Sequence, residues 1–339
     1  MLGRLRKVFS GNSAALSAEA AVAPTEISAG NAPTLLLPQF FIQHENMPLL
    51  DGHRLASWLN DNVPIESRTS MLNEAKLAWL LHVRDALGAG YQLIESKTAL
   101  VLSSLNPTTA RTTANFMSKA LEQVLGALNG IAQAPQSGKD ILIVFEDAEH
   151  YYRYLSFYYP DAAARGLSRG MYLRAGVWHF VAVKADLYAS QSMMVHEITR
   201  LCLAHLPLPL WLNVGITVNT GRQLVKNKSC GGCSSQQLHH QLLTYWDESE
   251  IPKFWSDASF QRADEGLELS YELARIMVEV LARDWPSFKD FVLSAHADDA
   301  GAAAARAHLD TDLGELVCAL LGRDDQAGWS PLSRELVIQ

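Results

Sequence analysis

The stretch HEITRLCLAHLPLPLWLNVGITV, residues 196–218, contains two apolar segments separated by a turn with two prolines. Apolar residues recur in both segments at helical spacing, which predicts one helix over residues 190–206 and another over residues 209–225. Proline cannot continue a helix but suits its first turn, so the prolines mark the end of the first helix and the start of the second. His196 and Glu197 lie on the first of these helices.

His196 and Glu197 form the first half of the zinc-binding pattern H-E-x-x-H. In this pattern two histidines four residues apart on a helix are only about 40° apart, so both rings reach one zinc ion. The glutamate beside the first histidine is then the general base for the metal-bound water. Here Arg200 stands in the position of the second histidine. A guanidinium stays protonated and has no lone pair to donate, so it cannot bind the metal.

The order of segments around this stretch resembles the peptidase MA-like group of gluzincin zinc metallopeptidases. A hairpin expected over residues 171–185 precedes HEITR, and WLNVG follows it where the group typically reads WLNEG. The likeness extends over residues 70–322 and includes FEDAEHYYRY, FWSDASF, LSYELA and an Ala-rich helix near the C terminus. The resemblance implies an α+β, zincin-like metallopeptidase fold, with a mixed sheet, an active-site-type helix and a helix-rich C-terminal half.

The resemblance also assigns roles to particular positions. His196 matches the first zinc ligand and Glu197 the general base, whereas Val214 stands where the third ligand, a glutamate, belongs. Tyr271 lies where related enzymes place a hydrogen-bond donor to the transition state, although a half-buried aromatic side chain at a helix start is the simpler interpretation. With one of three ligands retained, we expect no zinc at His196, Arg200 and Val214, and no cofactor.

A charge count suggests what replaces the metal. An intact site balances a dication against two carboxylates, whereas this chain offers one guanidinium, Arg200, and one carboxylate, Glu197. Both sets are neutral, and residues three apart on a helix can form an ion pair. We therefore expect a Glu197–Arg200 contact in the vacated position. The alternative is that Arg200 points to solvent while His196 packs in the core.

A second candidate metal site lies in the segment KNKSCGGCSSQQLHH, residues 226–240. The thiolates of Cys230 and Cys233 can bind one zinc ion, and His239 or His240 can add a nitrogen ligand. The pattern is weak, because six residues separate Cys233 from His239 and adjacent histidines project in different directions. A flexible glycine-rich loop is the favoured interpretation, and a zinc site is the alternative.

Length and composition limit the class of protein. The chain has 339 residues, 48% of them hydrophobic, and a formal charge of −8, which argues against non-specific nucleic-acid binding. It lacks a run of about 18 apolar residues, so no membrane span is expected. The basic start is not followed by a continuous apolar segment, so we expect no signal peptide and a cytoplasmic protein.

The domain organisation is expected to be simple. Residues 1–34 are predicted to form a disordered Ala/Ser-rich tail. Residues 35–339 are predicted to form a single zincin-like domain, with a mixed α/β part over 35–187 and a helical part over 188–339. Residues 35–70 are expected to be irregular. Further expected elements are helices over 71–88, 111–131, 148–160, 270–284 and 286–296, and strands over 91–105 and 140–147.

These features favour a catalytically inactive metallopeptidase-like protein, a pseudopeptidase that keeps the cleft and either binds a peptide or protein partner or has a regulatory role. The alternative is a zinc-dependent peptidase or hydrolase with a non-standard ligand set drawn from His196 and the segment that contains Cys230 and Cys233.

Overall fold

The computed structural model describes residues 22–28, 33–135, 137–160, 170–174, 176–225, 235–323 and 329–331. The chain divides into two compact units, each built from two separate stretches of sequence. The first comprises Met1–Glu122 and Pro135–Met194, and the second comprises Gln123–Ala134 and Val195–Gln339.

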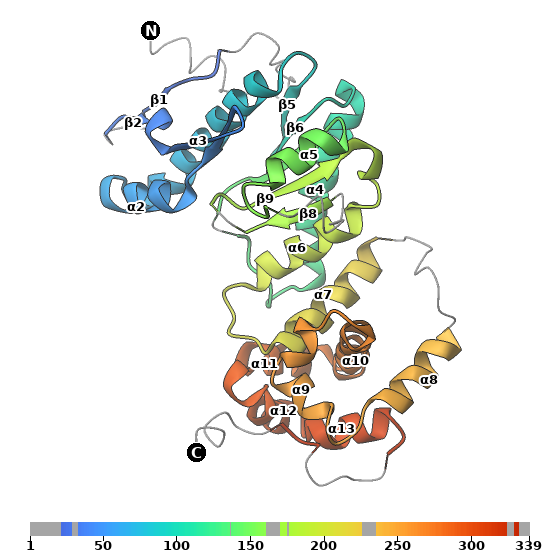
Figure 1. Ribbon diagram of the computed structural model, residues 1–339. Helices are drawn as coiled ribbons and strands as arrows, with labels where there is room; N and C mark the ends of the chain where they lie inside the picture. The colour runs from blue at the N-terminus through green and yellow to red at the C-terminus, as the bar shows by residue number, and fades with distance from the viewer. Residues whose placement is uncertain are drawn as a thin grey trace. The chain divides into compact units, whose positions relative to one another are not determined.

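A five-stranded mixed sheet forms the centre of the first unit (Figure 1). The three inner strands run parallel to one another, and both edge strands are antiparallel to their neighbours. Every residue of the inner strands is buried, as expected for strands covered on both faces. The sheet confirms the α+β class and the mixed sheet. In spatial order the strands are β5 (Gln92–Glu95), β6 (Ala99–Ser103), β7 (Asp140–Phe145), β9 (His179–Val183) and β8 (Gly170–Leu173).

Three of the sequence-based predictions describe this sheet. The hairpin expected over 171–185 is confirmed by the antiparallel pair β8 and β9. The strand expected over 140–147 is confirmed by β7. The single strand expected over 91–105 is wrong in one respect, because a turn at residues 96–98 divides it into the antiparallel pair β5 and β6.

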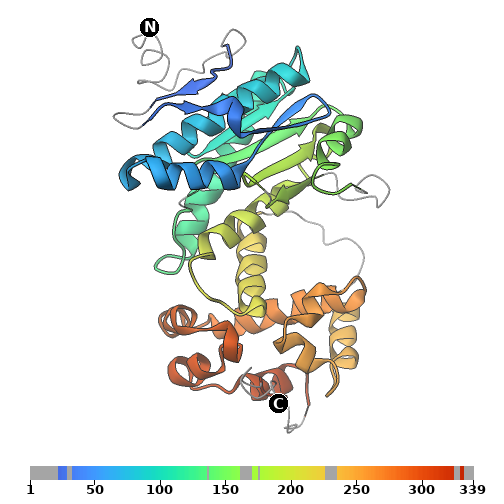
Figure 2. The same ribbon diagram turned by 60° about the vertical axis from the view of Figure 1, so that its left-hand side comes forward.

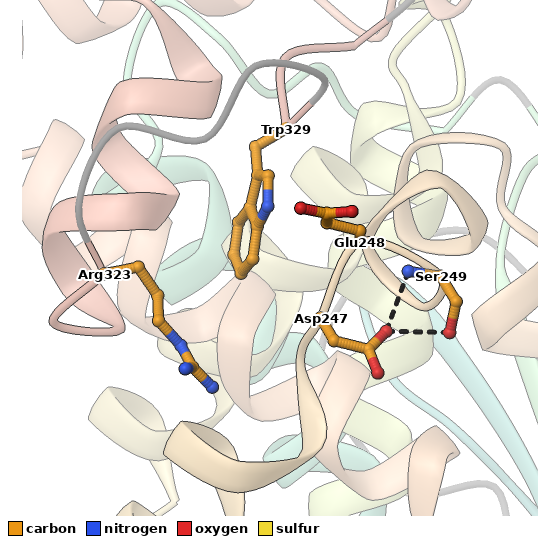
Figure 3. A pocket seen from close by; sticks show the side chains of 5 residues that line it. All are labelled: Asp247, Glu248, Ser249, Arg323 and Trp329. Atoms are coloured by element: carbon orange, nitrogen blue, oxygen red, sulfur yellow. Dashed lines mark hydrogen bonds between the residues drawn. The ribbon is translucent and has the colours of Figure 1, made fainter.

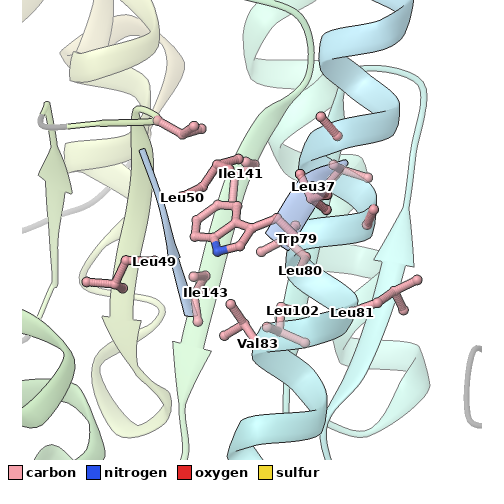
Figure 4. Packing of buried hydrophobic residues seen from close by; sticks show 14 of the residues in the cluster. Leu37, Leu49, Leu50, Trp79, Leu80, Leu81, Val83, Leu102, Ile141 and Ile143 are labelled. Atoms are coloured by element: carbon pink, nitrogen blue, oxygen red, sulfur yellow. The ribbon is translucent and has the colours of Figure 1, made fainter. Parts of the chain in front are cut away.

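Helices pack on the sheet of the first unit. Helix α3 (Ile65–Leu87) lies against β5 and β6, as Figure 2 shows, and α5 (Ala148–Leu155) contacts β7 and β9. Helix α4 (Pro107–Ala127) connects β6 to β7. Trp79 of α3 is buried among apolar side chains from the sheet and from the segment before α3, and its Nε1 donates a hydrogen bond to Pro48 O at 2.7 Å (Figure 4).

The prediction that residues 35–70 are irregular is wrong. The segment contains the short helix η2 (Leu37–Phe40), a hairpin of β3 (Phe41–His44) and β4 (Met47–Leu50), and α2 (Gly52–Asn62). Glu45 and Asn46 both have positive φ, as a two-residue hairpin turn requires. All four residues of β4 are buried and the strand packs on α3, so tertiary burial orders a segment whose own periodicity is weak.

The predicted disordered tail does not extend over residues 22–28. Strand β1 (Glu26–Ile27) pairs with β2 (Leu35–Leu36), and the side chains of Ile27 and Leu35 are buried. Residues 1–21 lie outside the described residues. Pairing with β2 and contact with α3 therefore order residues that composition alone assigns to a tail.

The described part of the second unit is helical and contains no strand. Helix α7 packs along α10, and this approach requires Gly215, because a Cβ at that position would lie 2.4 Å from Ala274 O. None of the described helices combines the length and hydrophobicity needed to cross a membrane. The helices are α6 (Gln191–Leu203), whose first turn belongs to the first unit, α7 (Leu210–Leu224), α8 (Ser235–Tyr245), α9 (Ile251–Trp255), α10 (Glu265–Leu281), α11 (Trp285–Ser294), α12 (Ala302–Leu309) and α13 (Leu313–Leu320).

Candidate functional site

Helix α6 presents the HEITR residues next to a buried face. Val195, Ile198 and Cys202 are buried, and the hydroxyl of Thr199 donates to Val195 O at 2.8 Å, which satisfies a polar group inside the helix packing. His196, Glu197 and Arg200 are half-buried. The apolar residues thus hold α6 in place while the polar ones remain partly accessible.

His196 has one ring nitrogen close to a carboxylate and the other without a partner. Its Nδ1 lies 3.5 Å from Glu197 Oε1, and the two side chains are 23% and 13% exposed. Its Nε2 is buried and has no hydrogen-bond partner among the described residues. A buried polar atom without a partner costs free energy, so it marks a position where a ligand or a proton donor would be favourable.

Tyr271 of α10 lies beside this histidine. The two ring centroids are 6.5 Å apart and the ring planes are inclined by only 18°. Tyr271 also contacts Phe260, with the ring centroids 6.0 Å apart and the planes tilted by 56°. The structure therefore brings together three of the residues selected from the sequence, His196, Glu197 and Tyr271.

The expected Glu197–Arg200 ion pair is absent from the described structure. The ion pair found for Glu197 within this part of the chain is the one with His196. Spacing of three residues permits an i,i+3 pair but does not impose it. Glu197 Oε1 instead lies 3.5 Å from Nδ1 of the neighbouring imidazole, and Arg200 forms no ion pair with another described residue.

Val214 lies on α7 and is buried, with 1% of its surface exposed. The start of α7 is fixed by Trp211, whose Nε1 donates to Ala300 O at 3.0 Å. The preceding residue, Asn213, has a buried side-chain oxygen without a hydrogen-bond partner among the described residues. An aliphatic side chain at position 214 offers no lone pair to a metal.

The donor set does not fit zinc. A catalytic zinc ion needs three protein ligands, and of positions 196, 200 and 214 only the first carries a donor. Within the described ranges, no group of three or more His, Cys, Asp or Glu side chains is arranged to hold a metal ion.

The alternative metal site is not covered by the structure. Cys230 and Cys233 lie outside the described residues, so the predicted zinc site there stays a prediction. His239 and His240 belong to α8, and the side chain of His240 is exposed. The other two cysteines, Cys202 and Cys318, are buried and form no disulfide, as their apolar helical surroundings predict.

A cavity of about 520 Å³ between α7, α8 and α10 was not expected from the sequence. Tyr271 lines it, so the cavity adjoins the ring that stacks on His196. The signal in the sequence is the spacing of three glutamates at positions 265, 268 and 272, which places them on neighbouring faces of one helix. Other lining residues include Val218, Arg222, Leu238 and Leu269.

A smaller cavity of about 390 Å³ is lined by Asp247, Glu248, Ser249, Arg323 and Trp329 (Figure 3). Its polar groups are largely explained by local structure. Asp247 Oδ1 accepts hydrogen bonds from the backbone N and the hydroxyl of Ser249 at 2.8 and 2.7 Å, and these bonds lower the pKa of its carboxyl group. Asp247 thus caps a turn.

Comparison with known proteins adds no family assignment. No family model matches this chain, and no curated protein matches it significantly.

Proposed function

We propose that this chain is a metallopeptidase-like protein of the gluzincin type that has lost its zinc site and serves as a peptide- or protein-binding pseudopeptidase. One observation carries the proposal. His196 keeps a buried Nε2 without a partner among the described residues, while Arg200 and Val214, neither able to coordinate a metal, stand at the other two ligand positions.

The arrangement of elements supports a zincin-like scaffold. A mixed five-stranded sheet precedes α6 in the chain, α7 follows α6 after a short proline-rich turn, and a helical region follows α7. Tyr271 of α10 stacks on His196, so two of the residues that the family resemblance selects are in contact.

The remaining residues are poorly suited to hydrolysis. In the active relatives a metal supplies the Lewis acid and lowers the pKa of the attacking water. Here Glu197 can accept a proton, but the donor set at positions 196, 200 and 214 cannot hold the ion that would activate water. The polar groups that remain are suited to binding a peptide, through hydrogen bonds to its backbone or side chains.

The scaffold is tested by restoring the ligands. The double variant R200H/V214E should bind zinc at about one ion per chain, and adding His196→Ala should abolish that binding. The matched control R200H/V214L has the new histidine without the new carboxylate and should bind zinc far more weakly. Metal analysis after dialysis, with circular dichroism to verify folding, measures the outcome. A folded double variant that gains no zinc would contradict the zincin-like arrangement.

The unpartnered Nε2 of His196 also favours a second candidate, a zinc-dependent hydrolase that completes its ligand set with Cys230, Cys233, His239 or His240. Metal analysis of the unmodified protein separates the two. Near-stoichiometric zinc that disappears in both His196→Ala and the C230A/C233A variant would favour the hydrolase and overturn the pseudopeptidase.

A further inference from the structure

The cavity between α7, α8 and α10 has the size and lining of a binding site. Its volume, about 520 Å³, lies within the range of pockets that hold small ligands or single side chains with their neighbours. The apolar part of the cavity wall includes Val218, Leu238 and Leu269. An apolar stem entering this space would be removed from water, which is favourable.

One carboxylate that lines the cavity is already neutralised. Glu272 is 12% exposed and accepts hydrogen bonds from Arg222 Nη2 at 3.0 Å and from Arg275 Nε and Nη2 at 3.0 and 2.7 Å. Asn219 adds a bond from its amide to Arg275 O, which ties this network to α7. The network holds α7 and α10 together. The charge of Glu272 is already balanced by these arginines, so it does not require a cation from a ligand.

Two other carboxylates on the lining have no such partner. Glu265 and Glu268, in the first turn of α10, are exposed and form no ion pair or hydrogen bond with another described side chain. The cavity therefore combines apolar wall with an excess of negative charge. A lysine or arginine side chain matches both features, since its aliphatic stem packs on apolar surface while its charged end stays near carboxylates and water.

We propose that this cavity binds a lysine or arginine side chain of the peptide partner. The inference rests on the proposed function, because it names the chemistry of the partner held by the vestigial site. Tyr271 joins the two regions: it lines the cavity and stacks on His196. A peptide whose basic side chain enters the cavity would therefore pass close to the Tyr271 ring, on whose neighbour His196 the proposed function rests.

The test uses fluorescein-labelled peptides Ala-Ala-X-Ala-Ala, with X arginine, lysine, leucine or glutamate, and fluorescence anisotropy with the full chain. The arginine and lysine peptides should bind more tightly than the leucine peptide, and the glutamate peptide most weakly. The E265Q/E268Q variant should weaken binding of the basic peptides roughly three- to tenfold, as expected for two partly exposed ion pairs, and leave the leucine peptide unchanged.

Glu315→Gln is the matched control. Glu315 is an exposed carboxylate in the first turn of α13, so its loss reproduces the effect of removing a charge from a helix start without touching the cavity. Equal affinity of the arginine and leucine peptides for the unmodified protein would overturn the proposal, as would an unchanged preference in E265Q/E268Q. Butylguanidine that competes as strongly as the arginine peptide would overturn the assignment to a peptide.

These outcomes are separable from failure of the proposed function. If R200H/V214E gains zinc while basic peptides show no preference, the cavity assignment fails and the scaffold stands. If the restored variant gains no zinc but the peptides bind as expected, the scaffold fails and the cavity remains a site for basic side chains.

Discussion

His179 in the first unit and His196 in the second differ in how fully their ring nitrogens are hydrogen-bonded. His179 on β9 of the first unit is 1% exposed and has both ring nitrogens hydrogen-bonded. Nδ1 donates to Val177 O at 2.6 Å, so Nε2 accepts from the hydroxyl of Tyr154 at 2.7 Å. His196 in the second unit is partly exposed, with Nδ1 at 3.5 Å from a carboxylate and Nε2 unpartnered among the described residues.

The difference teaches how to separate a structural histidine from a candidate site. Hydrogen bonds satisfy both nitrogens of the neutral His179 imidazole, and the Trp79 ring packs on it in a T-shaped arrangement with the centroids 5.6 Å apart. Burial lowers the pKa of His179 from 6.5 to about 4. His196 has a buried ring nitrogen for which the described residues provide no partner, which is the condition under which an external ligand gains most.

Replacing each histidine by alanine should give the largest difference in stability between the two sites. His179→Ala opens a cavity in the core and removes the acceptor of the Tyr154 hydroxyl, so it should lower the free energy of unfolding by about 4 kcal/mol. His196→Ala removes a partly exposed ring with an unused nitrogen and should change it by less than about 1 kcal/mol. Urea denaturation measures both, and equal losses would erase the distinction between the two sites.

Acid should destabilise the protein through His179. The pKa of this histidine is lower in the folded than in the unfolded protein, so its contribution is complete above pH 6.5 and is lost as the pH falls toward 4. The difference corresponds to roughly 3 kcal/mol. The measurement is the free energy of unfolding between pH 7 and pH 4 for the unmodified protein and His179→Gln, which should lack this part of the dependence.

Two other buried groups, Lys76 and Asp140, have shifted pKa values, and both are retained in the unmodified protein and in His179→Gln. Burial lowers the pKa of Lys76 to about 8 and raises that of Asp140 to about 6. The raised pKa of Asp140 acts in the opposite sense below pH 6, because the folded protein then binds its proton more readily. The difference between the unmodified protein and His179→Gln removes both contributions. Parallel pH curves would show that His179 is not the destabilising group.

Tyr154→Phe would make His179 resemble His196 by removing the partner of its Nε2. The substitution keeps the ring and should lower the free energy of unfolding by about 1.5 kcal/mol, the cost of one unsatisfied buried polar atom. Tyr271→Phe, beside His196, breaks no hydrogen bond to the described part of the chain and should change stability by less than about 0.5 kcal/mol. Thermal and urea unfolding compare the pair, and a larger loss for Tyr271→Phe would reverse the argument.

The contact between Glu197 and His196 should have the smallest effect. Its 3.5 Å separation is long, so in a double-mutant cycle of Glu197→Gln and His196→Ala we expect a coupling energy of less than about 0.5 kcal/mol. A coupling energy above about 2 kcal/mol, measured by urea denaturation, would mean that this pair stabilises the fold.

Much of the architecture follows from local patterns. The periodicity of residues 190–206 and 209–225 predicted α6 and α7 to within a few residues, because proline ends and starts helices through its own geometry. The buried strands were visible as short apolar runs. The hairpin β3–β4 was missed because its two short strands become distinguishable only when they pack on α3.

The candidate site divides in the same way. Residue identity alone determined that Arg200 and Val214 cannot bind a metal, because coordination requires a lone pair that neither side chain offers. Only the tertiary structure decided which neighbour Glu197 contacts, that Tyr271 stacks on His196, and that α7, α8 and α10 enclose a cavity. Chemical capacity belongs to a side chain, whereas contact and enclosure depend on which distant segments the fold brings together.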